Sequence, residues 1–183
     1  MPTPTIYSRI PNPYVYGTEG QTNVSTLYAP GELGAAFNGV NGVGYLRVQL
    51  DSGATSATPV GAVAAGQVAF WKSRPNAIVT NDKRFCDAGA TNSVDRVAGF
   101  FSNAPTAGNY TDLVIAGVGV SVATDNSTYA FGLKLVADPT ANTARVTIVA
   151  NGTASPSQQL GIAKGVAASN MVLADVSIGF VTE

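Results

Sequence analysis

The chain has 183 residues, of which 45% are apolar and only 11% charged, and its net charge is −1 at pH 7. A charge this close to zero excludes the basic stripe that a nucleic-acid-binding surface needs. One cysteine and no histidine exclude an internal disulfide and a Cys/His zinc site. We expect no membrane segment, because no run approaches ~18 apolar residues, and no signal peptide, because MPTPTIYSRIPNPY has no apolar core.

Residues 1–44 differ in composition from the rest of the chain, because they hold five of the ten prolines and four of the seven tyrosines. Proline fixes φ and biases the preceding residue to extended geometry, so this segment is predicted to be neither helical nor central in a sheet. Tyrosines on an extended backbone are good anchors. We predict an N-terminal arm that lies across a neighbouring subunit or a scaffold, with contacts from Tyr7, Ile10, Tyr14, Tyr16 and Tyr28.

A Gly-rich stretch, GELGAAFNGVNGVG, is interpreted as a flexible linker, since it lacks the lysine and the strand–loop–helix context of a phosphate-binding loop. It leads into the first predicted strand, residues 45–50, where apolar and polar side chains alternate. Short segments rich in Val, Thr, Ile and aromatic residues follow, most of them bounded by Gly, Pro, Asn or Asp. These predicted strands are 67–71, 77–80, 96–101, 110–116, 118–123, 131–136, 144–150, 159–165 and 171–178.

No window of ten or more residues keeps an uninterrupted helical period, so the fold class is predicted to be all-β. We expect a compact barrel or sandwich over residues 45–183, preceded by the arm. Weak internal similarity also predicts a duplication, with one β-unit in 45–117 and another in 118–183. Three pairs of segments align, at offsets that drift from 132 − 66 = 66 through 162 − 97 = 65 to 175 − 112 = 63: 66–70 with 132–136, 97–98 with 162–163, and 112–116 with 175–179.

The predicted hairpin in residues 64–82, AAGQVAFWKSRPNAIVTND, holds the single tryptophan. Its fainter copy in residues 130–148 lacks the tryptophan and both neighbouring basic residues. The common fold therefore does not need Trp71, Lys72 and Arg74, which we interpret as a contact site. Two alternatives stay open. Trp71 could cap the core at the hairpin edge, or it could form a sugar- or base-stacking platform with Arg74.

The sequence contains no recognisable catalytic set. Without histidine, a Ser-His-Asp or Cys-His arrangement cannot be built, and Cys86 has basic neighbours but no base. The carboxylates are scattered singly, and the backbone bonding of aspartate at turns explains Asp51, Asp82, Asp125 and Asp138. Two distant carboxylates that meet in space stay open as a glycosidase pair. We expect a protein that is not an enzyme and has no cofactor and no metal site.

Four parts of the sequence together resemble the head decoration (cement) proteins of tailed bacteriophages: 66–71, 97–99, 105–108 and 110–117, with 161–163 similar to the closing strands of that family. The first is a Gly-led strand that ends in an aromatic residue before a polar hairpin. A Val-Ala-Gly strand, a turn with Pro and Gly, and an apolar strand ending in Gly follow. The resemblance covers roughly residues 60–183 and is one of pattern, while the arm in 1–44 is longer than the termini of that family.

The resemblance implies a structural virion protein that binds the outer capsid surface, stabilises contacts between major capsid subunits, and is made in the host cytoplasm. It implies the major capsid protein and further copies of the chain as partners, with a trimer favoured over a dimer. Nucleic acid and membrane are not expected as partners. The alternatives are another virion component, such as a head-fibre or tail module, and a carbohydrate-binding β-module that uses Trp71.

Overall fold

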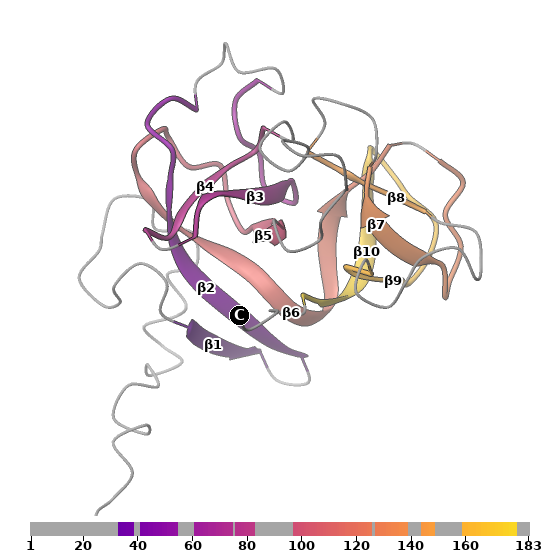
Figure 1. Ribbon diagram of the computed structural model, residues 1–183. Helices are drawn as coiled ribbons and strands as arrows, with labels where there is room; N and C mark the ends of the chain where they lie inside the picture. The colour runs from indigo at the N-terminus through magenta and orange to yellow at the C-terminus, as the bar shows by residue number, and fades with distance from the viewer. Residues whose placement is uncertain are drawn as a thin grey trace, which may run out of the picture.

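The computed structural model describes residues 33–38, 41–54, 61–74, 76–82, 97–125, 127–138, 144–148 and 159–178. Within these ranges every regular element is a strand, which confirms the predicted all-β class. The strands are β1 (Leu33–Asn38), β2 (Asn41–Leu50), β3 (Val68–Ser73), β4 (Ile78–Thr80), β5 (Val97–Phe101), β6 (Tyr110–Ala123), β7 (Lys134–Ala137), β8 (Val146–Ile148), β9 (Gly161–Ala163) and β10 (Met171–Ser177) (Figure 1).

Strands β2, β4, β3, β5 and β6 pair in that order, and β6 pairs back with β2, so these five strands form a closed barrel. The β2–β4 pair is parallel, whereas the other pairs of the barrel are antiparallel. Closure removes the open sheet edges within the barrel. We call β2–β5 with the N-terminal half of β6 the first unit.

Strand β6 continues past the barrel, and its C-terminal half pairs with β10 (Figure 1). Strands β9, β7 and β8 follow in that order, and a parallel bridge from Thr124 to Val146 joins the end of β6 to β8. We call β7–β10 with this half of β6 the second unit. The sequence predicted two strands here, divided at Gly117. That division is wrong, because Gly117 pairs with Val43 on one side and Val176 on the other.

Two apolar clusters form the core. One lies inside the barrel and includes the side chains of Leu46, Val48, Trp71, Val79 and Leu113. The other combines the inner side chains of the second unit with the outward side chains of β3, β5 and β6. Both faces of β5 are therefore covered, and all five of its residues are buried. Such burial replaces the polar–apolar alternation of a half-exposed strand with a continuous apolar run.

The two units share their connectivity, and corresponding residues make the same backbone hydrogen bonds. Gly66 N donates to Phe101 O, and Gly132 N donates to Ala163 O, each over 2.8 Å. Both glycines have positive φ, at 79° and 86°. By these bonds, Ala163 corresponds to Phe101. The sequence comparison had matched Ala163 with Ala98 instead. The duplication of 45–117 into 118–183 stays a prediction about the origin of the chain.

The first strands of the fold also differ from the expectation. The Gly-rich stretch predicted as a linker forms β1 and the start of β2, which pair antiparallel from Leu33 opposite Leu46 to Asn38 opposite Asn41. The linker interpretation is wrong, because hydrogen bonds to β1 on one side and β6 on the other hold residues 43 and 44. The arm predicted over residues 1–44 is therefore too long, because residues 33–38 and 41–44 are paired strand. Residues 1–32 lie outside the described residues, so an extended arm there stays a prediction.

Candidate functional site

Trp71 lies on β3, where it pairs with Val79 of β4 inside the first unit. Only 8% of its surface is exposed, and its ring belongs to the cluster that fills the barrel. Of the roles that the sequence left open, the structure gives Trp71 a position in the core. A stacking platform needs an exposed ring face, which this position does not offer. Its Nε1 has no hydrogen-bond partner among the described residues.

Lys72 and Arg74 follow Trp71 at the exposed end of the β3–β4 hairpin. The Nζ atom of Lys72 lies 2.6 Å from Oδ2 of Asp51, which ties β3 to the end of β2. Arg74 is half-buried, and its carbonyl accepts a hydrogen bond from Ala77 N in the turn. Lys72 and Arg74 thus lie close in the chain at this hairpin end. The other predicted contact residues, Tyr7, Ile10, Tyr14, Tyr16 and Tyr28, lie outside the described residues. A contact role for these seven residues stays a prediction.

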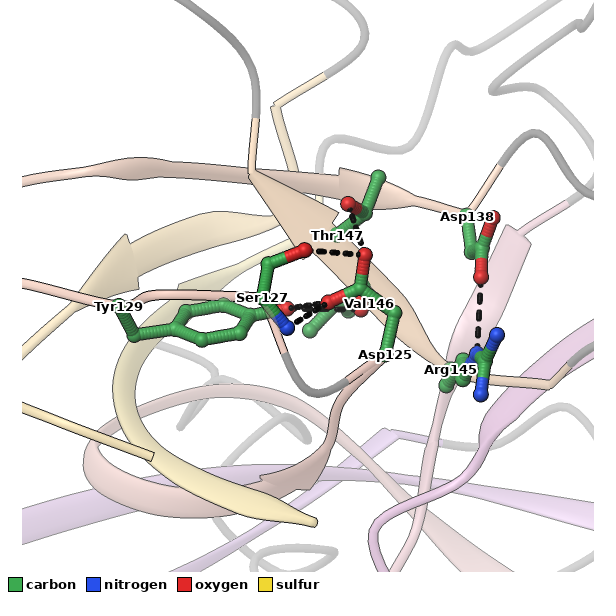
Figure 2. Close-up of polar contacts among 7 residues, drawn as sticks. All are labelled: Asp125, Ser127, Tyr129, Asp138, Arg145, Val146 and Thr147. Carbon is green, nitrogen blue, oxygen red and sulfur yellow. Dashed lines mark hydrogen bonds and ion pairs between the residues drawn. The ribbon is translucent and has the colours of Figure 1, made fainter. Parts of the chain in front are cut away.

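A second polar cluster surrounds Asp125, which directly follows β6 and its bridge to β8 (Figure 2). Its carboxylate accepts hydrogen bonds from Ser127 N over 3.0 Å, from Ser127 Oγ over 2.7 Å and from Tyr129 Oη over 2.8 Å. Thr147 Oγ1 on β8 is the fourth donor. Tyr129 Oη also lies 3.0 Å from the carbonyl oxygen of Val146, and its ring is buried in the core. The cluster joins β6, the following loop and β8.

Burial alone would raise the pKa of Asp125, but the hydrogen bonds from Thr147, Ser127 and Tyr129 outweigh it and lower that pKa from 3.8 to about 2. Burial raises the pKa of Tyr129 above its ordinary value, and the nearby charge of Asp125 raises it further. At neutral pH Asp125 is therefore ionised and Tyr129 is protonated. A carboxylate with four donors and so low a pKa is suited to fastening strands and unsuited to donating a proton at neutral pH.

Other aspartates also make specific tertiary contacts. Asp138, almost fully buried, accepts a hydrogen bond from Arg145 Nε over 2.8 Å (Figure 2). Asp112 lies opposite Arg47 in the β2–β6 pair, with 3.0 Å between Oδ1 and Nη1, and the guanidinium lies 5.9 Å from the ring centre of Tyr110. The explanation of Asp51, Asp125 and Asp138 by local turn bonding is therefore incomplete.

Sequence reasoning missed the Asp125 cluster except for one local signal. An aspartate that bonds the backbone two residues ahead is a common turn, and Asp125 with Ser127 fits it. The contact to Thr147 depends on the position of β8, which no local spacing reveals. Within the described part of the chain, no group of three or more His, Cys, Asp or Glu could hold a metal ion. No helix long and apolar enough to cross a membrane occurs in that part either.

No protein-family model and no curated protein matches the chain. Among solved structures, the chain is similar to the crystal structure of the head fiber gp8.5 N base in bacteriophage phi29. The two share 16% sequence identity with a TM-score of 0.41, over 76% of this chain and 98% of that chain. A TM-score of 0.41 is too low to define the fold or the function of this chain.

Proposed function

We propose that this chain is a structural protein of a tailed-bacteriophage virion, which binds the outer capsid surface and stabilises contacts between major capsid subunits. The resemblance to head decoration proteins supports the proposal. Its residues fall on β3, on β5, in the turn before β6, on β6 and on β9. Most of them therefore lie in the wall of the first unit, and the remainder lie in the second unit.

The observation that carries the proposal is where the charged and the apolar side chains lie. Four lysines and arginines of the described residues pair with aspartates: Arg47 with Asp112, Lys72 with Asp51, Arg145 with Asp138 and Lys164 with Asp175. Each pair lies within one unit, two pairs in each, so the charges are distributed and not gathered at one site. Large apolar side chains are exposed instead. This distribution favours contact over chemistry, and so a structural role over an enzymatic one.

The partners in this proposal are the major capsid protein and further copies of the chain, and the location is the outside of the virion after synthesis in the host cytoplasm. An oligomer that touches several capsid subunits at once would be retained strongly even if each contact is modest. Apolar contacts are little screened by salt, which fits a chain with so few charges. We propose neither nucleic acid nor membrane as a partner.

The test is co-sedimentation of the full chain with purified heads of the source phage, with the number of copies per head measured. We expect saturation at a simple ratio to the capsid protein, and retention at about 1 M salt, where the Debye length is only about 3 Å. A few copies per head would contradict the decoration role and favour a head-fibre or tail module. No binding at all would overturn the proposed capsid role, and a glycan array would then test carbohydrate binding.

A further inference from the structure

The second unit carries a group of exposed apolar side chains on and beside β9 and β10. Among the described residues, five large apolar side chains are exposed, and four of them belong to this group. They are Phe131, Val166, Leu173 and Ile162, with 78%, 80%, 54% and 39% of their surface exposed. We call these four residues the β9–β10 face. The fifth, Val118, is 44% exposed and lies on β6 next to Gly119, whose N donates to Oδ1 of Asp175 over 3.1 Å.

Strand register shows that these side chains are neighbours. Ile162 lies directly opposite Asp175 of β10 and Lys134 of β7, and residues directly opposite one another share a face of a sheet. Leu173 is two residues before Asp175 and so lies on that same face. Gly132 N donates to Ala163 O, which places Phe131 at the end of β9 from which the loop with Val166 leaves. The four side chains therefore form one surface.

In the first unit, the position that corresponds to Ile162 is covered by the second unit. Because Phe101 corresponds to Ala163, Phe100 corresponds to Ile162. Phe100 is 1% exposed and packs against the second unit. In the second unit the corresponding position is exposed, and Lys134 and Asp175 lie beside it. A mixture of apolar residues with a few charges is the composition of a protein–protein interface and not of a core.

We infer that the β9–β10 face is the interface through which one copy of this chain binds a second copy, an inference that rests on the self-association in the proposed function. Its four apolar side chains expose on the order of 400 Å² of surface, within the range of the largest patches on monomers, which are often functional. A standard interface buries about 800 Å² per partner. The rest of the contact area would therefore come from polar neighbours such as Lys134, Lys164 and Asp175.

The charges on the face also fit a second copy. Lys164 Nζ lies 3.3 Å from Oδ1 of Asp175, and Lys134 lies on the same face, so both signs of charge are present. This mixture suits a charged face that pairs with itself across a two-fold axis, because a cation of one copy can then meet a carboxylate of the other. A surface of one sign would repel its own copy.

The experiment measures the mass of the full chain in solution by light scattering after size exclusion, together with a melting curve. Leu173→Glu introduces a charge into the centre of the face, and Phe131→Ser removes its largest side chain. Ala104→Glu is the matched control, because it also charges an exposed apolar residue but lies between β5 and β6 in the first unit. We expect the wild-type chain and Ala104→Glu to have at least twice the monomer mass.

Leu173→Glu and Phe131→Ser are expected to be folded monomers, because both positions are exposed. They should melt cooperatively, a few degrees below Ala104→Glu, since they lose the stabilisation that assembly adds. A wild-type chain that stays monomeric at roughly 100 µM, far above the Kd of an ordinary stable interface, would overturn the inference. So would a Leu173→Glu variant that keeps the wild-type mass. If the assembly survives Leu173→Glu but is lost on removal of residues 1–32, the arm joins the copies instead, and the inference is equally overturned.

Discussion

Asp125 illustrates how a single carboxylate fastens one element of this fold to another. Its backbone N donates to Val146 O over 3.2 Å, and its side chain accepts bonds from the following loop and from Thr147. In the first unit, Asp51 N donates to Val79 O over 2.8 Å, and its carboxylate pairs with Lys72. Each unit thus places an aspartate where its first strand ends, and each aspartate secures a neighbouring strand through its side chain.

Replacing Asp125 tests this fastening role. We expect Asp125→Asn to lower the free energy of unfolding by about 1–3 kcal/mol at pH 7, the usual contribution of hydrogen bonds to a charged group. The folded pKa of about 2 lies below the ordinary 3.8, so this contribution is fully present above pH 4 and is lost as the pH falls through 2. Urea unfolding of both proteins at pH 7, 4, 3 and 2 measures it.

The stability difference between wild type and Asp125→Asn should therefore shrink on acidification. Thr147→Val is the control, because it removes one of the four donors and keeps the carboxylate. It should cost about 1 kcal/mol at pH 7, as one hydrogen bond does, and it should shift the acid transition to higher pH. A stability difference that stays constant from pH 7 to pH 2 would show that Asp125 does not act through its charge.

Trp71 gives the second prediction for a single residue. Because the ring fills the barrel interior, Trp71→Ala should lower the free energy of unfolding by about 3–5 kcal/mol. Trp71→Phe keeps most of the ring and removes an Nε1–H that has no partner among the described residues, so it should cost much less. Melting curves of the isolated protein measure both. A Trp71→Ala protein as stable as wild type but defective in binding heads would restore the contact role.

At the level of elements, β6 belongs to both units, and the turn at Gly66, which precedes β3, packs closely against the end of β6. Gly66 O accepts from Ala123 N at the end of β6, and a Cβ on Gly66 would lie 3.0 Å from Ser121 O and 2.5 Å from Met171 Cε. The corresponding Gly132 has no atom within 4 Å of such a Cβ. The two glycines share a positive φ but differ in available space.

Alanine at these two glycines therefore separates backbone strain from crowding. Gly132→Ala should cost about 1 kcal/mol, because alanine at positive φ is strained and nothing else changes. Gly66→Ala should cost about 2–4 kcal/mol, since the same strain is joined by a clash with the backbone of β6. Denaturant unfolding of the two variants measures the difference. Equal losses would show that β6 moves away without cost and that the close fit is not needed.

At the level of the whole molecule, the structure shows how many N-terminal residues can be deleted without removing a strand. Strand β1 begins at Leu33 and pairs with β2, so a deletion of 1–40 would remove a paired strand as well as the predicted arm. Deletion of residues 1–32 should leave the melting temperature of the β-body within a few degrees and weaken binding to heads. Co-sedimentation measures the binding, and a truncated chain that binds as tightly as the full chain would exclude an anchoring role for the arm.

Much of the strand content could be predicted from the sequence. Every strand from β2 to β10 overlaps a predicted segment, because apolar β-branched runs between Gly, Pro, Asn and Asp mark strands locally. The errors fall where tertiary pairing overrides composition. Glycines that predicted a linker became part of β2, and a glycine that predicted a break at 117 lies within β6, since partners on both sides hold the backbone in place.

The sequence by itself determined the all-β class, the positions of most strands and the absence of a histidine-based catalytic set, because these follow from local pattern and composition. Only the tertiary structure decided that Trp71 fills the barrel, that Asp125 meets Thr147, and that Ile162 is exposed where Phe100 is buried. Each of these depends on which strands become neighbours across long stretches of chain. Neighbours of that kind are chosen by the packing of the whole core and not by the residues adjacent in sequence.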